Sequence, residues 1–342
     1  MLYKEYALFF ISKATRKYFA ARLCPNLGRA WNFEPYHPIL MHCPLPHNPL
    51  PPIKKFCIRL IPLSSLTHCA AGPRAIHTFR RDDANTCDVS VYGLALLNNQ
   101  LYILYDTDEN RVAVYSTIDF TFLRHISIPD TKNADLQDIV ACSRKQCIYI
   151  SECAPDGCVH RLGLDGSVCR WPVKCAASMS VMRNSNLLVV CDDGSGNGLG
   201  RLREISSENG DSVRKISPQL PADPNMYIRH GIQLSDNEYV ICYFDGETTG
   251  ISRIDNDGRI LQSSDSQLRM AYYMAVDNDN FSFVADFVKN QILVFDPSLN
   301  FVCRVAESFI VWPSSLFYDD LTRRLYVGQG DKDDRCVVII QL

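Results

Sequence analysis

The chain has 342 residues, of which 46% are hydrophobic and 21% are charged, and its net charge is −3. This balance is typical of a folded globular protein and excludes an intrinsically disordered chain. No apolar run approaches the ~20 residues that a membrane-spanning helix needs. The charge is uneven, because residues 1–81 hold 12 Lys and Arg against two acids (+10), while residues 82–342 hold the other 23 against 36 acids (−13). Such an asymmetry indicates two regions with different histories or partners.

Residues 1–73 are predicted to form a basic, proline-rich N-terminal extension that is irregular or partly helical. The first thirty residues have the Lys- and Arg-rich, partly amphipathic pattern that mitochondrial presequences share. Residues 35–55 (PYHPILMHCPLPHNPLPPIKK) are proline-rich and read as an extended, poorly ordered segment. His37, His42, Cys43 and His47 lie in this segment at a spacing that matches no standard zinc pattern, so we expect no metal there.

From residue 74 onward, short strands alternate with turns rich in Asp, Asn and Gly, and no segment has the periodicity of a long helix. Six similar strands begin 46, 40, 52, 42 and 44 residues apart, and each has a strand before it and another after it. They are LYILYD (101–106), CIYISE (147–152), LLVVCD (187–192), YVICYFD (239–245), FSFVAD (281–286) and LYVGQG (325–330). Four antiparallel strands repeated every ~40–50 residues predict an all-β, six-bladed β-propeller over residues 74–342.

The sixth unit is incomplete, because its third strand, CVVIIQL (336–342), is followed by no fourth strand. Propellers remove their open sheet edges by completing one blade with a strand from the other end of the chain. The segment AIHTFRR (75–81) precedes the first complete unit and is the candidate for this closing strand.

The turn after the second strand has a common pattern in the first and fifth units. An acid is followed four residues later by Asn, and Arg or Gln then opens a strand with Val and an aromatic residue. These positions are Asp106, Asn110, Arg111, Val112, Val114 and Tyr115, and then Asp286, Asn290, Gln291, Ile292, Val294 and Phe295. The pattern resembles the NHL-repeat family of six-bladed propellers. In animals such propellers often end tripartite-motif proteins, so the resemblance implies a propeller that binds protein or RNA in ubiquitin-ligase-related proteins. Nothing in this chain resembles the RING or B-box zinc modules of that group.

An acid closes the second strand in five of the six units, at Asp106, Glu152, Asp192, Asp245 and Asp286. One alternative is a ring of carboxylates that holds a hard cation such as calcium. Because the acids recur at equivalent off-axis positions, we instead expect each of them to accept backbone N–H groups in its own turn.

Other residue types give no signature for chemistry. Cys142, Cys147, Cys153 and Cys158 are spaced by five, six and five residues, which does not match the paired CxxC of zinc ribbons. No GxSxG motif is present. His125, His160 and His230 fall in strands or at their ends, with no cysteine or serine nearby in a recognisable arrangement. The sequence therefore predicts neither a cofactor nor a metal.

The function predicted is a non-enzymatic scaffold that binds an unidentified protein through its loops. The residues expected to contact this partner are Asp108, Arg111, Phe244, Phe287, Lys289 and Asp331. The first alternative is a calcium-dependent hydrolase of the lactonase kind, which requires carboxylates from several blades on the axis. The second is an RNA-binding propeller, which the −13 charge of residues 82–342 disfavours. Abundant cysteine within strands favours a reducing compartment and a cytoplasmic location, with mitochondrial targeting by the basic N-terminus as the alternative.

Overall fold

The computed structural model describes residues 73–80, 90–105, 111–129, 131, 134–191, 200–220, 226–244, 248–265, 267–305, 309–330 and 335–342. The predicted N-terminal extension, including His37, His42, Cys43 and His47, lies almost entirely outside these residues. The part that is described contains strands and turns and no helix. It therefore has no helix long and apolar enough to cross a membrane.

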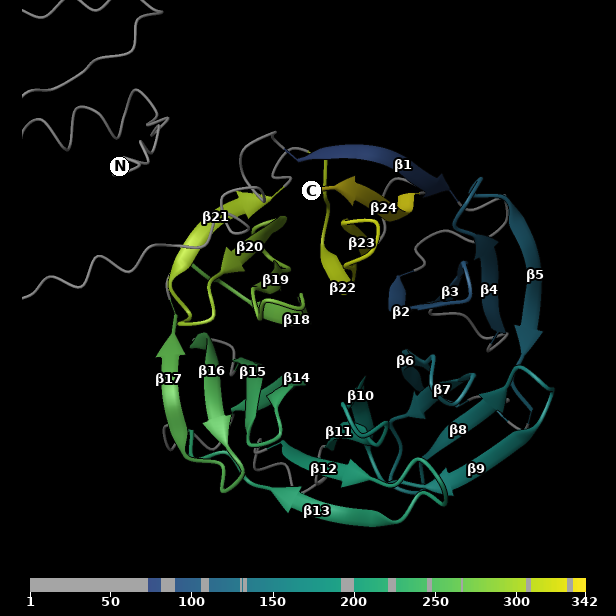
Figure 1. The fold of residues 1–342 in the computed structure, drawn as a ribbon, viewed down its shortest axis with the longest axis horizontal. Helices are drawn as coiled ribbons and strands as arrows, with labels where there is room; N and C mark the ends of the chain where they lie inside the picture. Colours follow the sequence, from purple (N-terminus) through teal and green to yellow (C-terminus); the bar gives the residue numbers. More distant parts are fainter. Residues whose placement is uncertain are drawn as a thin grey trace, which may run out of the picture. The chain divides into compact units, whose positions relative to one another are not determined.

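The strands form six four-stranded antiparallel sheets, arranged as blades around one axis (Figure 1). The innermost strands are β2 (Val91–Leu97), β6 (Leu136–Cys142), β10 (Ala176–Val181), β14 (Tyr227–Ser235), β18 (Ala271–Val276) and β22 (Pro313–Asp319). The second strands are β3 (Gln100–Tyr105), β7 (Cys147–Glu152), β11 (Leu187–Cys191), β15 (Glu238–Phe244), β19 (Ser282–Asp286) and β23 (Arg324–Gln329). The third strands are β4 (Arg111–Ser116), β8 (Cys158–Gly163), β12 (Arg201–Ile205), β16 (Thr249–Asp255), β20 (Gln291–Phe295) and β24 (Arg335–Gln341). The outermost strands are β5 (Phe122–Ser127), β9 (Val168–Pro172), β13 (Ser212–Ile216), β17 (Ile260–Ser264), β21 (Phe301–Val305) and β1 (Arg74–Arg80). The predicted six-bladed propeller is confirmed.

The blades are numbered 1 to 6 from the inner strand β2 to the inner strand β22. The sixth blade combines strands from far apart in the sequence, because β1 pairs antiparallel with β24 and Thr78 lies opposite Val338. This pairing gives the last blade its outermost strand at the rim of the ring (Figure 1).

The hydrophobic core lies between neighbouring blades. The second strands are buried on both faces, as in β7, where all six residues are buried, and this explains their nearly continuous apolar sequences. Ile148 and Ile150 of blade 2, for example, pack in one cluster with Val112 and Val114 of blade 1. The outermost strands are much more exposed, as in β5, where five of the six residues are exposed and the remaining one is half-buried.

The cysteines behave in two ways. Eight described cysteines are free thiols, and five of these, Cys142, Cys147, Cys158, Cys191 and Cys242, are buried, as expected for small apolar side chains. Cys303 in β21 is disulfide-bonded, which differs from the expectation that cysteines within strands are free thiols.

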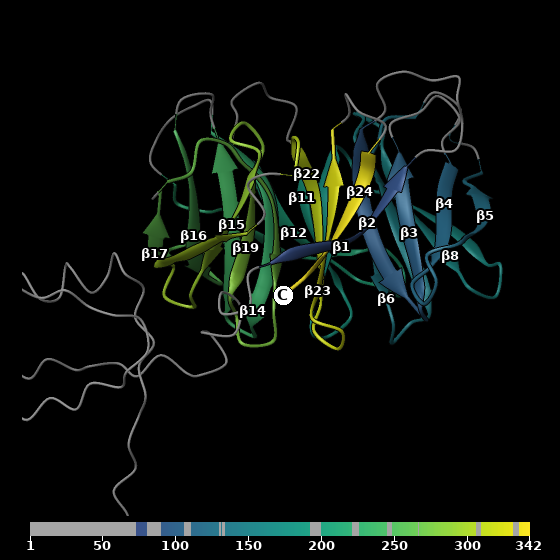
Figure 2. The same cartoon turned by 90° about the horizontal axis from the view of Figure 1, so that it is seen from above.

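The two faces of the propeller differ in the connections they carry. Seen from the side, the strands run between the two faces (Figure 2). Because successive strands are antiparallel, the turns after the second strands and the connections between blades lie on the same face, which we call the loop face. The turns after the first and third strands lie on the other face.

Candidate functional site

Each inner strand carries a β-bulge near its loop-face end. In all six first-to-second strand pairs the register shifts by one residue at the equivalent position, which leaves one residue unpaired. The unpaired residues are Tyr92, Gln137, Ala177, Arg229, Tyr272 and Ser314. A bulge changes the direction of side chains and is frequent beside functional sites. These six positions, at the loop-face ends of the inner strands, are therefore candidates for a functional site.

Two of the bulged residues, Arg229 and Tyr272, belong to a row of contacting aromatic rings and one guanidinium on the loop face. The guanidinium of Arg229 lies 5.3 Å from the ring centre of Tyr272 and 5.9 Å from that of Tyr227. The ring centre of Phe287 is 5.2 Å from that of Tyr272 and 6.1 Å from that of Trp312. We call Tyr227, Arg229, Tyr272, Phe287 and Trp312 the aromatic row. All five side chains keep contact with solvent, so the row is a partly exposed surface built from blades 4, 5 and 6.

Several predicted contact residues lie at or beside this row. Phe287 belongs to it, and the exposed Lys289 lies in the same turn, with its Nζ donating to the carbonyl oxygen of Gln267 at 2.6 Å. Phe244 is half-buried and is the cross-strand partner of Tyr227. Arg111 is half-buried at the start of β4 in blade 1, three blades from Tyr227.

Two predicted contact residues, Asp108 and Asp331, lie outside the described residues. The other members of the row were missed because their approach depends on contacts between blades.

The residues that follow the bulges form a buried ring around the axis. They are Gly93, Asp138, Ser178, His230, Tyr273 and Ser315. The hydroxyl of Tyr273 lies 2.9 and 3.0 Å from the two carboxyl oxygens of Asp138. Their strands belong to blades 5 and 2, which stand opposite one another, so this contact spans the axis (Figure 1). Gly93 permits the close approach of β2 to β6, because a Cβ there would lie 2.6 Å from the Ile139 nitrogen.

Burial perturbs the titration of the ionisable groups near the axis, and it raises the pKa of Tyr273 well above its usual value. It raises the pKa of Asp138 to about 7, against the opposing effect of hydrogen bonds from the Met179 N–H, Tyr273 hydroxyl and Ile139 N–H. Burial lowers the pKa of His230 to about 4. The neutral His230 ring stacks on Tyr273 at 3.9 Å and donates from Nε2 to the Met179 carbonyl oxygen at 3.1 Å. Its Nδ1 has no hydrogen-bond partner among the described residues.

The two turn acids that the structure describes have different partners. Asp286 in blade 5 accepts the backbone N–H groups of Arg269 at 2.9 Å and Met270 at 3.1 Å, besides one from Lys289 in its own turn at 3.4 Å. Glu152 in blade 2 is instead contacted by side chains. Asp106, Asp192 and Asp245 lie outside the described residues.

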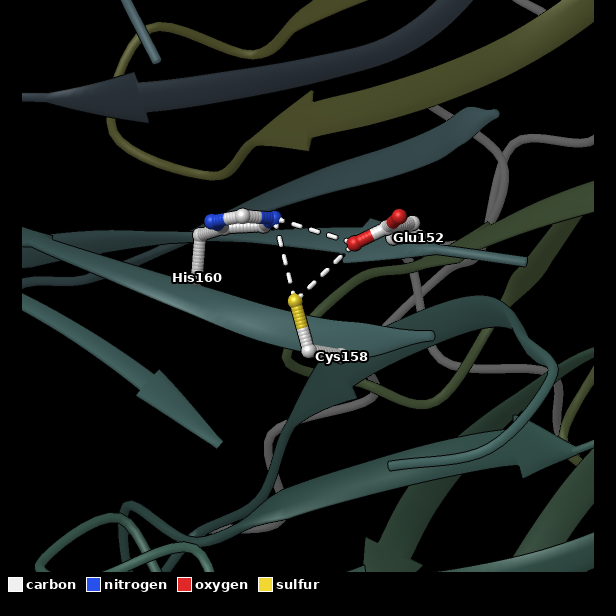
Figure 3. A group of neighbouring side chains, drawn as sticks. All are labelled: Glu152, Cys158 and His160. Atoms are coloured by element: carbon white, nitrogen blue, oxygen red, sulfur yellow. Dashed lines mark hydrogen bonds and ion pairs between the residues drawn. The ribbon is translucent and has the colours of Figure 1, made fainter. Parts of the chain in front are cut away.

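Glu152 meets a thiol and an imidazole on one face of blade 2 (Figure 3). Its Oε2 lies 3.0 Å from Cys158 Sγ and 3.4 Å from His160 Nε2, and Sγ lies 3.1 Å from Nε2. Arg170 donates from Nε to Sγ at 2.8 Å and from Nη2 to Oε2 at 3.3 Å. Burial and the Glu152 contact raise the pKa of Cys158 to about 12, although Arg170 lowers it, so the thiol is protonated at neutral pH.

His160 does have a cysteine beside it, although the two do not form a recognisable nucleophile signature. The signal was present in the sequence, since Cys158 and His160 are two residues apart on one strand and therefore share a face. The contact is not a Cys–His–acid triad, because Glu152 and Cys158 both approach the same imidazole nitrogen, Nε2. In a triad the acid holds the other ring nitrogen.

The sequence matches no family model and none of the curated proteins. Solved structures are similar over most of the chain. Virginiamycin B lyase from Staphylococcus aureus is 14% identical with a TM-score of 0.53, and the match covers 79% of this chain and 88% of that one. The WD40 β-propeller domain of Doa1 is 12% identical with a TM-score of 0.53, covering 79% of this chain and 97% of the domain. Hydrazine synthase of Kuenenia stuttgartiensis is 12% identical with a TM-score of 0.55, and the match covers 73% of this chain and 83% of that one. At these identities the likeness concerns the propeller fold alone.

Proposed function

We propose that the protein is a non-enzymatic interaction module whose loop face binds an acidic, aromatic-containing segment of another protein. The observation that carries this proposal is the aromatic row across blades 4, 5 and 6. Tyr, Trp and Arg are the residues most enriched at the energetic centres of protein interfaces, because they combine a large apolar area with a polar group.

Charge beside the row supports an acidic partner. Arg229 is part of the row. Lys289 is exposed in the same turn as Phe287, and the exposed Arg269 precedes Met270, whose carbonyl oxygen accepts the Phe287 N–H. An extended segment with carboxylates would meet these cations, while its apolar or aromatic side chains would contact Phe287 and Trp312.

The arrangement at the axis favours this function over the calcium-dependent hydrolase. Among the six buried residues that follow the bulges, Asp138 has the one carboxylate, whereas calcium takes six to eight oxygen ligands. Both of its oxygens already have donors, from Met179, Ile139 and Tyr273. Its role in the proposed module is therefore to hold opposite blades together beneath the binding surface.

We also propose that the chain is related to NHL-repeat propellers. In blade 5 the Asn of the pattern, Asn290, has a left-handed φ of 53° and accepts the N–H of Trp312 at 2.8 Å. The pattern thus positions a member of the aromatic row, which gives it a reason to occur in a binding propeller.

We also propose a cytoplasmic location. Eight free thiols among the described cysteines support a reducing compartment, whereas the disulfide at Cys303 is more typical of an oxidising one.

The proposal is tested with two face variants and a matched control on the other face. Proteins captured from native extract by the wild type are compared with those captured by Arg229→Ala, Phe287→Ala and Leu321→Ala. Leu321 is 96% exposed in the turn after β22, so it controls for loss of an exposed apolar side chain.

We expect one partner to be retained by Leu321→Ala and lost by both face variants. Direct titration with a purified acidic segment of that partner should show at least a ~30-fold loss of affinity for each face variant, as expected for a residue at the centre of an interface. Capture of RNA instead of protein, or equal loss with Leu321→Ala, would contradict the proposal.

A further inference from the structure

The loop end of blade 2 brings three potential metal ligands together. The register that pairs Ser151 with Val159 places Glu152 opposite Cys158, at the ends of β7 and β8. His160 lies two residues further along β8, so its side chain projects from the same face as Cys158. Glu152 is 8% exposed, Cys158 2% and His160 1%. The three buried side chains point toward one another from β7 and β8, and their ligand atoms lie within 4.8 Å of one another (Figure 3).

We propose that Glu152, Cys158 and His160 form a zinc-binding site. Thiolate sulfur, imidazole nitrogen and carboxylate oxygen are the atoms that zinc takes in proteins, and three protein ligands with a fourth open position are a recurring zinc arrangement. Calcium and magnesium do not fit, because they prefer an all-oxygen set.

The spacing of the three atoms agrees with tetrahedral coordination. Zinc bond lengths of about 2.0–2.3 Å at tetrahedral angles separate neighbouring ligand atoms by about 3.4–3.6 Å. The distance from His160 Nε2 to Glu152 Oε2 is 3.4 Å, and Cys158 Sγ lies 3.0 and 3.1 Å from these two atoms. The thiol would need to move outward by roughly half an ångström to admit the ion.

The three close contacts in this cluster cannot all be hydrogen bonds at the same time. The single proton of the Cys158 thiol lies within reach of both Glu152 Oε2 and His160 Nε2, but it can be donated to one of them only. Nε2 in turn either donates to Glu152 or accepts from Cys158. A cation at the centre would interact with all three atoms at once.

Arg170 supplies the positive charge in the metal-free protein. It lies opposite His160 in the pairing of β8 with β9, and its guanidinium contacts both Cys158 and Glu152. Its side chain is 49% exposed, so it can turn into solvent when zinc enters. Arg170 therefore competes with the metal, and its removal should strengthen zinc binding. If the cluster were only an ion-pair network, removal of Arg170 would create no metal affinity.

The first test measures zinc directly in the full chain. Protein purified in zinc-containing buffer is dialysed against buffer without metal, and its metal content is determined by mass spectrometry. We expect about one zinc ion per chain in the wild type and in Cys169→Ser, which removes an exposed thiol from the neighbouring strand of the same blade. Cys158→Ser and His160→Gln should lose zinc affinity by more than the ~10–100-fold typical of outer-shell substitutions. Arg170→Ala should bind zinc more tightly than the wild type.

Cobalt absorption of the wild type tests the site without any variant, so it applies even if a ligand variant does not fold. Cobalt added to the metal-free wild type should give the near-ultraviolet charge-transfer band of a thiolate–cobalt bond, together with the visible bands of four-coordinate cobalt. Absence of these bands in folded wild type, or zinc content that falls equally in Cys169→Ser and Cys158→Ser, would overturn the proposal.

Discussion

Blades 2 and 5 offer a comparison of two equivalent positions with different chemistry. Glu152 ends β7 and Asp286 ends β19, and each acid lies opposite the first residue of the next strand, Cys158 in blade 2 and Gln291 in blade 5. Two residues further on, blade 2 has His160, whereas blade 5 has Leu293. The outermost strand places an Arg opposite this position in both blades, at Arg170 and Arg304.

The difference follows from the neighbours that each acid finds. Asp286 is fully buried and its carboxylate is occupied by backbone N–H groups and by Gln291 Nε2 at 3.1 Å. Glu152 is one carbon longer and reaches a thiol and an imidazole that have no counterpart in blade 5. A repeat therefore fixes where an acid lies, and two residues on the next strand decide whether that acid supports a turn or joins a candidate metal site.

The largest effect should come from removing the acid of blade 5. Asp286→Ala leaves three backbone N–H groups and the Gln291 amide without their acceptor, so we expect the free energy of unfolding to fall by about 3 kcal/mol or more. Urea unfolding of the purified protein measures this. Asp286→Asn keeps one acceptor oxygen and should lie between the wild type and the alanine variant. A loss no larger than that of Asp165→Ala, in an exposed turn, would contradict the role of Asp286.

The same two blades are joined across the axis, and Tyr273→Phe breaks that link. The variant removes the hydroxyl that donates to Asp138, which should cost about 2 kcal/mol at pH 8. The pKa of Asp138 is about 7 in the folded protein and lies near 4 when unfolded, so its carboxyl weakens the fold as pH rises from ~4 to ~7. Loss of the donor raises this pKa further, and the deficit of the variant should therefore be larger at pH 8 than at pH 5.

Urea unfolding at the two pH values measures the loss of stability in Tyr273→Phe. The matched control is Tyr272→Phe, which changes the bulged residue directly before Tyr273. His230 contributes a pH dependence of stability that is opposite to that of Asp138. Its pKa is lowered to about 4, so its contribution is lost as pH falls from ~6.5 to ~4 in both proteins. Comparing the variant with the wild type at each pH removes this common effect. A deficit for Tyr273→Phe that is independent of pH would contradict the proposed link.

The strands could be predicted from the sequence because their signals are local. The predicted range 147–152 coincides with β7, and the predicted ranges 187–192 and 281–286 differ from β11 and β19 by one residue, since continuous apolar residues end there at turn residues. The bulges could not be predicted in this way. A bulge depends on how each inner strand pairs with its neighbour, and no residue type marks it, as the unpaired residues include Ala177, Arg229 and Ser314.

The sites were predictable only in part, for the same reason. Phe287 and Lys289 could be proposed as contact residues because they lie in a recognisable turn, and that proposal stays a prediction. The contact between Asp138 and Tyr273 joins residues 135 positions apart and exists only once the ring has closed. The cluster around Glu152 was within reach of the sequence, because the spacing of Cys158 and His160 on a predicted strand already places both on one face.

Removing the acid of blade 2 should have a smaller effect than removing that of blade 5. In metal-free protein Glu152→Ala should lower the free energy of unfolding by about 1 kcal/mol, because the thiol is a weak donor and the guanidinium of Arg170 can turn to water. Urea unfolding with a chelator present measures it, beside Asp286→Ala under the same conditions. An equal loss in the two variants would show that both acids stabilise the fold to the same extent, which would contradict the difference inferred between blades 2 and 5.

The smallest effect should come from Arg170→Ala in the absence of metal. Its guanidinium is half exposed and keeps much of its hydration in the folded protein, so we expect its removal to cost about 0.5 kcal/mol or less although Glu152 itself is buried. Arg304→Ala is the matched control, since Arg304 occupies the equivalent position in blade 5 and donates to Gln267 Oε1 at 2.9 Å. Both variants should unfold at nearly the wild-type urea concentration when a chelator is present. Zinc should then separate them by raising the unfolding midpoint of Arg170→Ala more than that of Arg304→Ala, because the metal stabilises the folded state in proportion to its affinity. An equal shift in the two variants would mean that Arg170 does not compete with a metal and that blade 2 differs from blade 5 in hydrogen bonding alone.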